Sequence, residues 1–211
     1  MLSAFIPLFF TSCGGGPTPI RPPAIDASDA GYAAMELYDT NGDGKVVGDE
    51  LDKAPGLKAA MATLDADQDG KVAAEEIAAR IHSWQASEIG VAAIYCTVNM
   101  DGQPLVGATV TFEPESFLGD GLQAGISTTD DFGGAYPTIP KEERPMADMP
   151  PGLRLGFYRV KVSKKVNGKE TIPAVYNTKT ILGQEVAPDD PAIINRKIRF
   201  DLMNRPQAEA L

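Results

Sequence analysis

Two twelve-residue loops carry side chains whose types and spacing suit a divalent cation. The loops span 39–50 and 65–76, and both fit the pattern D-x-[DN]-x-[DN]-G-x₅-E at every position. Calcium is a hard cation that takes about six to eight oxygen ligands, here from positions 1, 3, 5, 7 and 12 of each loop. Position 7 contributes its backbone carbonyl and position 12 both oxygens of its carboxylate. The predicted ligands of two calcium ions are Asp39, Asn41, Asp43, Lys45, Glu50, Asp65, Asp67, Asp69, Lys71 and Glu76.

The remaining loop positions fit the same chemistry. Gly44 and Gly70 stand at position 6, where the chain must turn sharply with a positive φ. Val47 and Ala73 stand at position 9 and have no side-chain oxygen, so we expect a water molecule to bind the ion there. The second loop has four acidic ligands and the first has three, so we expect the second loop to bind calcium more tightly.

Apolar residues at helical spacing flank the loops and would position them. They recur from 57 to 64 before the second loop and at Ile77 and Ile81 after it. A proline and a glycine at 55–56 would end the helix after the first loop early and restart the chain. Val46 and Val72, at position 8 of each loop, are expected to form a short two-strand contact.

Residues 26–86 therefore resemble a paired EF-hand domain, in which two helix–loop–helix units share one core. The resemblance rests on the two complete loops and their flanking apolar residues, and it implies two calcium ions. A dockerin-like module also pairs such loops, and it is the nearest alternative. Dockerins lack the helix that enters each loop and favour Asp at position 12, whereas residues 57–64 predict an entering helix and both loops end in Glu.

The first sixteen residues have the composition of a targeting segment. Leu2–Phe10 is apolar and uncharged but too short to span a bilayer, which suits the apolar region of a secretory signal. The run is followed by Thr11, Ser12 and Cys13, and a small residue just before a Cys resembles the lipobox of bacterial lipoproteins, in which that Cys is acylated. This implies an extracytoplasmic protein anchored to a bacterial membrane, in the periplasm or at the cell surface, while cleaved secretion is the alternative. Residues 17–25 are expected to form a linker rich in proline.

Residues 88–203 carry strand-like runs separated by turn signals, and residues 204–211 are expected to form a tail. Asp101-Gly102 and Asn167-Gly168 are hairpin turn signals, the second typical of type I′. The segment 101–112 reads D-G-x-P-L-x-G-A-x-V-x-F and resembles carboxypeptidase regulatory-like and transthyretin-like domains. The resulting prediction is an α+β multidomain fold, with an N-terminal helical EF-hand pair and a C-terminal antiparallel β-sandwich of about seven strands.

Composition excludes several classes of function. The net charge of −10 argues against a nucleic-acid partner, which requires a basic face. Two Cys and one His cannot build a disulfide scaffold, a Cys-rich zinc module or a three-His metal site. Thirteen acidic and five basic residues lie between residues 26 and 82, so most of the excess negative charge falls where calcium would neutralise it.

Three residues that could in principle do chemistry are expected to have structural roles instead. His82 has no neighbouring His or Cys partner and is expected on the surface. Trp84 is expected to pack where the helices meet the strands, and Cys96 to be a small buried side chain.

We therefore expect a non-enzymatic, membrane-anchored calcium-binding protein in which calcium has a structural role. Its partners would be calcium, the lipid membrane through acylated Cys13, and a glycan or protein on the sandwich. The alternative function is a calcium-dependent adhesin or carbohydrate-binding protein.

Overall fold

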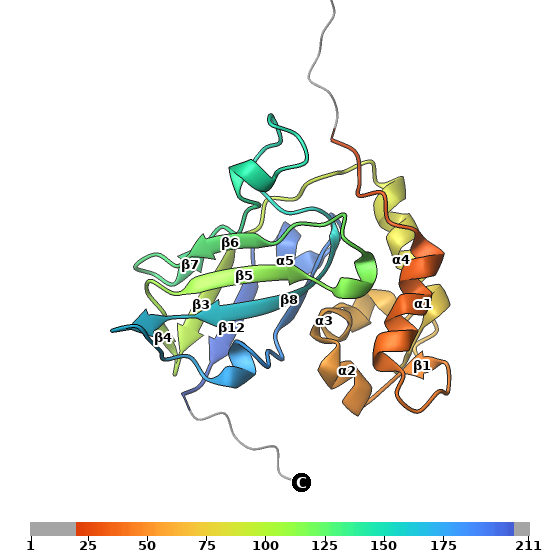
Figure 1. Cartoon of the computed structure of the whole chain (residues 1–211), viewed down its shortest axis with the longest axis horizontal. Coiled ribbons are helices and arrows are strands. Elements are labelled where there is room, and N and C mark those ends of the chain that lie inside the picture. The colour runs from red at the N-terminus through yellow and green to blue at the C-terminus, as the bar shows by residue number, and fades with distance from the viewer. Residues whose placement is uncertain (1–19, 205–211) are drawn as a thin grey trace, which may run out of the picture.

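A computed structural model describes residues 20–204 (Figure 1). The α-helices are α1 (Ala27–Tyr38), α2 (Asp49–Lys53), α3 (Pro55–Leu64), α4 (Ala74–Ala86) and α5 (Pro191–Ile194). The 3₁₀ helices are η1 (Ser116–Leu118), η2 (Lys141–Glu143) and η3 (Ala174–Tyr176). The longer strands are β3 (Cys96–Met100), β5 (Thr109–Pro114), β6 (Gly125–Thr128), β8 (Gly156–Ser163), β11 (Gly183–Val186) and β12 (Ile198–Leu202). The two-residue strands are β1 (Lys45–Val46), β2 (Val72–Ala73), β4 (Gln103–Pro104), β7 (Gly134–Ala135), β9 (Lys165–Val166) and β10 (Lys169–Glu170).

Two four-stranded sheets make up most of the strand structure in these residues. One has the order β11-β8-β5-β6 and is antiparallel throughout. The other joins β12, β3 and β4 in that order, with β7 also paired to β3, and β12 runs parallel to β3. Alternate residues of β12 are buried, so its apolar side chains enter the core on one face.

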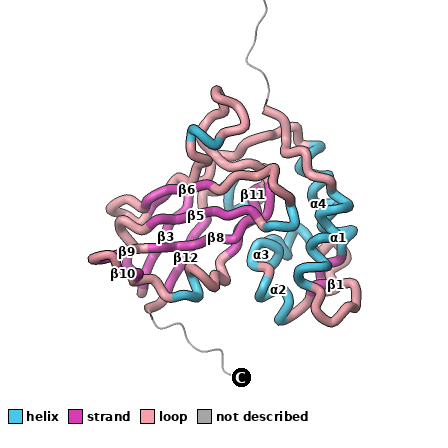
Figure 2. The backbone as a smooth tube through the Cα atoms, viewed as in Figure 1, coloured by secondary structure: helices cyan, strands magenta, loops and turns pink. Residues whose placement is uncertain are grey.

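The four N-terminal helices lie together at one side of the sheets (Figures 1 and 2). Helix α1 packs against α4, and α3 packs against β8 and β11. Gly183 permits this last contact, because a Cβ atom there would lie only 1.8 Å from the carbonyl oxygen of Pro55. Buried apolar side chains continue from the helices into both sheets, so the hydrophobic core is shared.

The two hairpin turns expected from local sequence are present. Asp101 and Gly102 have φ values of 51° and 77° between β3 and β4. Asn167 and Gly168 have φ values of 52° and 77° between β9 and β10. Two successive positive φ values are what a type I′ turn requires.

The expected fold class, an N-terminal helical EF-hand pair followed by an antiparallel sandwich of about seven strands, is wrong. The strands form several small sheets, many strands have two residues, and β12 pairs in parallel with β3. Helix α2 has only five residues because the chain breaks at Ala54 and restarts at Pro55. Helix α3 packs against β8 and β11, so the helices do not form a clear EF-hand pair.

No helix within residues 20–204 combines the length and the apolar character needed to cross a membrane. The expected signal segment with Cys13, the first part of the linker and most of the tail lie outside the described residues.

Candidate metal site

The two acidic loops lie side by side and are joined by the short antiparallel pair of strands β1 and β2. The first loop follows α1 and leads into α2, and the second connects α3 to α4. Lys45 pairs with Ala73, and Val46 pairs with Val72. Both valines are fully buried, so the ladder fixes one loop against the other and confirms the expected contact.

The second loop brings three of its predicted ligands together. Carboxylate oxygens of Asp65, Asp67 and Glu76 all lie within 4.8 Å of one another. The backbone N–H of Gly70 donates to Asp65 Oδ2 at 2.9 Å, and that of Asp69 donates to Asp67 Oδ1 at 3.2 Å. These bonds orient the carboxylates from outside the cluster and leave other oxygen lone pairs free for a cation.

Glu76 closes this cluster from the first turn of α4. Its two carboxylate oxygens accept hydrogen bonds of 2.9 Å from the N–H groups of Ala66 and Ala73. One residue thus ties the start of the loop to its end. The three converging carboxylates are hard oxygen donors, which is the donor type that calcium prefers.

Asp69, the fourth acidic ligand predicted here, is not part of the cluster. Its Oδ2 is ion-paired with Nζ of Lys45, which comes from the first loop. The hydrogen bond from Lys45 lowers the pKa of Asp69, and the same bond raises the pKa of Lys45. A cation that recruits Asp69 would therefore have to displace the Lys45 ammonium group.

The first loop is organised differently, around Asp39 and Glu50. Asp39 accepts from the N–H groups of Gly42 and Gly44 at 2.7 and 2.8 Å. Glu50 is only 5% exposed, and its carboxylate accepts from Thr40 and three backbone N–H groups. Burial acts to raise the pKa of Glu50, but these hydrogen bonds outweigh it and the pKa is lowered.

The other predicted ligands of the first loop are Asn41, Asp43 and the carbonyl of Lys45. Asn41 Oδ1 accepts from the N–H of Asp43 at 2.8 Å, and Asp43 Oδ1 accepts from the N–H of Lys45 at 3.0 Å. Within residues 20–204, only the second loop brings three carboxylates to within 4.8 Å of one another. The roles of the Lys45 and Lys71 carbonyls as ligands stay predictions.

Both glycines at position 6 adopt the conformation that the loop needs. Gly44 and Gly70 have φ values of 82° and 78°, in the left-handed region that side chains disfavour. Each directs its N–H at the carboxylate of position 1, Asp39 or Asp65. The turn therefore orients the first ligand of each loop.

Helix α4 connects the second loop to the sheet through residues spaced four apart. Glu76, Arg80 and Trp84 follow one face of the helix. Arg80 Nε and Trp84 Nε1 both donate to Glu185 Oε1, the second at 2.9 Å, and Glu185 on β11 is only 2% exposed. Arg80 also donates to both carboxylate oxygens of Asp189, at 2.8 and 2.7 Å.

A second buried glutamate anchors the first loop in the same way. Glu115 is fully buried and accepts from Tyr38 Oη at 2.8 Å, from Gly56 N at 3.0 Å and from Arg159 Nε at 2.9 Å. Tyr38 immediately precedes the first loop. Burial, with help from the charge of Glu115, raises the pKa of Tyr38 to about 12, so the phenol remains a donor.

Sequence reasoning missed Glu115, Arg159 and Glu185. An acidic residue in a strand or next to one is expected to face solvent until its tertiary partner is known. Only Arg80 carried a local signal, because it stands four residues after Glu76 and four before Trp84.

The remaining singled-out residues behave as structural side chains. Trp84 is 1% exposed and its ring lies 4.7 Å from that of Phe157 on β8, which confirms its expected place between helices and strands. Cys96 is fully buried, and burial raises the pKa of its thiol to about 12. His82 is exposed on α4.

No protein-family model matches this chain, and no curated protein matches it either.

Proposed function

We propose that the protein binds calcium through the two loops and that the metal stabilises its helical end. The observation that supports this most strongly is the convergence of Asp65, Asp67 and Glu76 at one point of the second loop. Three carboxylates held this close repel one another in the absence of a cation. A bound divalent ion would neutralise that repulsion.

The ligands that would hold the ion are already oriented by backbone N–H groups of their own loop. Little ordering would then accompany binding, which favours affinity. The first loop would hold a second ion with Asp39, Asn41, Asp43 and Glu50. In each loop the carbonyl at position 7, from Lys45 or Lys71, would add one more oxygen.

The function is structural on this proposal, and the protein is not an enzyme. Glu76 lies in the first turn of α4, and Arg80 and Trp84 of the same helix donate hydrogen bonds to Glu185. Calcium at the second loop would therefore hold α4 against β11. Tyr38 links the first loop to Glu115 in the same manner. Calcium would thereby stabilise the contact between helices and sheets.

Calorimetric titration of calcium into the protein and into Glu50→Gln and Glu76→Gln tests the proposal. We expect two sites in the parent chain and one in each variant, with the tighter site lost in Glu76→Gln. The absence of heat and of retained metal in the parent chain would remove the proposal. Tighter binding at the first loop would overturn the predicted order.

Lipid anchoring at Cys13 completes the proposal and rests on the sequence alone. An acylated Cys13 would hold the protein outside the cytoplasm at a bacterial membrane, in the periplasm or at the cell surface. Labelled palmitate is expected to enter the parent chain but not Cys13→Ala. Equal labelling of the two would show that the anchor is wrong.

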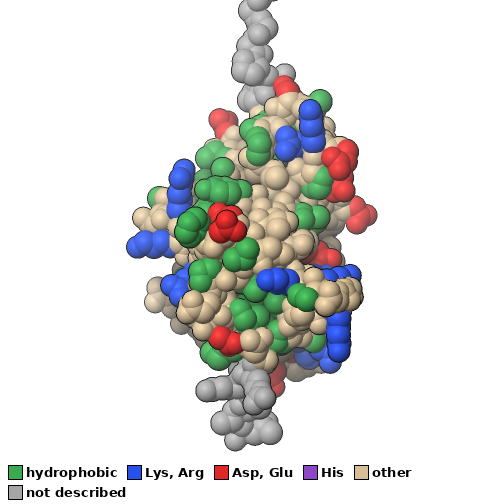
Figure 3. Space-filling model, turned by 90° about the vertical axis from the view of Figure 1, so that its left-hand side faces the viewer, with side chains coloured by type: hydrophobic (Ala, Val, Ile, Leu, Met, Phe, Trp, Pro, Cys, Tyr) green, Lys and Arg blue, Asp and Glu red, His purple; other side chains and the backbone are tan. Residues whose placement is uncertain are grey.

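A calcium-dependent adhesin or carbohydrate-binding protein is the second candidate, favoured by exposed aromatic side chains. Phe132 is 81% exposed and Tyr136 is 63% exposed, with the ring of Tyr95 only 4.9 Å from that of Tyr136. The face at the hairpin end of the sheets shows apolar side chains interspersed with charged ones (Figure 3). A glycan array probed with calcium and with chelator distinguishes this candidate.

A further inference from the structure

Arg154, in the segment that leads into β8, is a buried arginine without an acidic partner among the described residues. It is 9% exposed, and one nitrogen, Nη2, donates to the backbone carbonyl of Arg21 at 3.0 Å. Its Nε–H is buried and finds no acceptor within residues 20–204. Arg80 and Arg159 are each paired with a buried glutamate, and half-buried Arg144 donates to the backbone carbonyls of Ile139 and Met149.

A buried guanidinium strongly favours an anionic partner, because burial removes the water that would otherwise stabilise its charge. Burial lowers the pKa of Arg154, in agreement with this. Residues 1–19 contain no Asp or Glu, and residues 205–211 contain one, Glu209. An anion is the partner that this environment favours.

Arg154 lines a cavity of about 500 Å³, within the range of sites that hold small molecules. Met146, Met149, Pro22 and Pro23 supply an apolar wall from the loop after η2 and from the N-terminal segment. Both segments lie at the same end of the molecule in Figure 1. Gln123 also lines the cavity, and its buried Oε1 accepts no hydrogen bond from residues 20–204.

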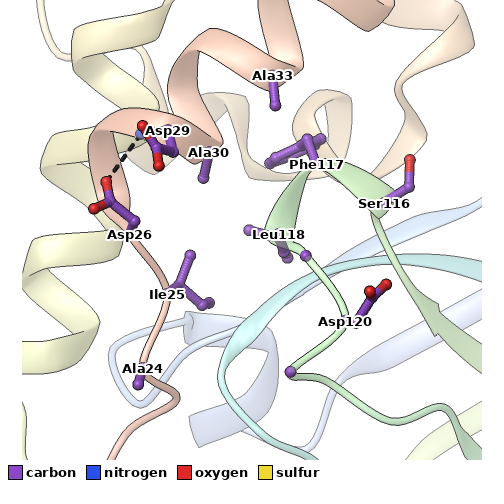
Figure 4. Close-up of a pocket in the computed structure, with 12 residues that line it drawn as sticks. Ala24, Ile25, Asp26, Asp29, Ala30, Ala33, Ser116, Phe117, Leu118 and Asp120 are labelled. Carbon is purple, nitrogen blue, oxygen red and sulfur yellow. Dashed lines mark hydrogen bonds between the residues drawn. The ribbon is translucent and has the colours of Figure 1, made fainter.

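The neighbouring pocket differs from the Arg154 cavity in the charge of the residues that line it. It shares Ala24 and Gly121 with the first cavity but carries Asp26, Asp29 and Asp120 around its apolar floor (Figure 4). Asp26 accepts from the N–H of Asp29 as the cap of α1. Three carboxylates would repel an anionic ligand there, whereas the Arg154 cavity offers a cation.

We propose that the Arg154 cavity binds an organic acid that carries one carboxylate and an apolar body. The carboxylate would accept from the guanidinium of Arg154 in a charge-assisted hydrogen bond. The apolar body would contact Met146 and Met149. The site is independent of the calcium loops.

Calorimetric titration of the full chain with N-acetyl-L-leucine tests the carboxylate, with N-acetyl-L-leucinamide as the matched neutral control. We expect the acid to bind and the amide to bind at least tenfold more weakly, the size of a lost charge-assisted hydrogen bond. Arg154→Gln should lose this preference, while Arg199→Gln, an exposed arginine on β12, should retain it. Equal binding of acid and amide, or binding of neither, would overturn the proposal.

A second variant tests the same cavity in case Arg154→Gln does not fold. Met146→Trp changes a half-buried loop residue and fills the cavity while leaving Arg154 in place. We expect it to lose binding of N-acetyl-L-leucine with an unchanged midpoint of unfolding. Undiminished binding in Met146→Trp would show that the ligand lies elsewhere.

Discussion

Glu76→Gln is the substitution that separates the metal-binding role of the second loop from its structural role. Glu76 Oε1 and Oε2 accept from the N–H groups of Ala66 and Ala73. Glutamine keeps one oxygen acceptor and the same shape. The loss of one hydrogen bond costs about 1 kcal/mol, but removing the charge also relieves repulsion from Asp65 and Asp67. The metal-free protein should therefore keep a similar stability. The charge and the second oxygen that calcium would use are lost.

The effect in calcium follows from linkage between binding and folding. At a free calcium concentration 100 times the dissociation constant, one site stabilises the folded state by about 2.7 kcal/mol. A variant whose affinity falls about a hundredfold keeps only about 0.4 kcal/mol of this. For a body of this size, about 1 kcal/mol corresponds to about 2–4 °C in Tm. Glu76→Gln should therefore lose about 5–9 °C of its calcium-induced rise in Tm.

Thermal unfolding followed by Trp84 fluorescence measures this directly, because Trp84 is the sole tryptophan and lies on the same helix as Glu76. The parent chain and the variant are compared with calcium and with chelator. The reasoning predicts similar Tm values in chelator and separated values in calcium. A calcium-induced rise that is equal in both proteins would refute it, and a drop of equal size in chelator would show that Glu76 is structural only.

Three further substitutions test other contacts of the fold. Arg80→Met leaves buried Glu185 without its cation, and we expect a loss of about 3–5 kcal/mol in the free energy of unfolding in urea. A loss below about 1 kcal/mol would show that this ion pair does not hold α4 against β11. Lys45→Met frees Asp69, so calcium affinity of the second loop should rise about threefold by calorimetry, since an exposed ion pair is weak; weaker binding would refute this competition. Burial acts to raise the pKa of Glu170, but its hydrogen bonds lower it to about 2. The ionised form of Glu170 therefore stabilises the folded state above pH about 4.3, and this contribution is lost as the pH falls toward 2. In urea titrations, Glu170→Gln should be less stable than the parent chain at pH 7 and equally stable near pH 2. A difference that persists unchanged at pH 2 would show that ionisation of Glu170 is not responsible.

Local sequence predicted the parts of the molecule that local contacts determine. Gly44 and Gly70 adopt the expected positive φ, and the turns at Asp101-Gly102 and Asn167-Gly168 form where their backbone preferences place them. Val46 and Val72 pair as their matching loop positions suggest. In each case the residues involved lie within one loop or in equivalent positions of two similar loops.

Long-range pairing could not be predicted in the same way. Strand β12 pairs in parallel with β3 although about a hundred residues separate them, and no pattern within either strand specifies that partner. The periodicity of 57–64 indicated a helix, but its docking on β11 depends on the close approach at Gly183. Glu115 and Glu185 are buried because Arg159 and Arg80 reach them, and nothing near either glutamate in the sequence shows this.

Direct measurement of bound metal tests the central claim. Purified protein is dialysed to equilibrium against millimolar calcium, and the metal retained per chain is determined by atomic emission. The account predicts two calcium ions per chain, with one remaining after Glu76→Gln. A chain that retains no calcium under these conditions would contradict it.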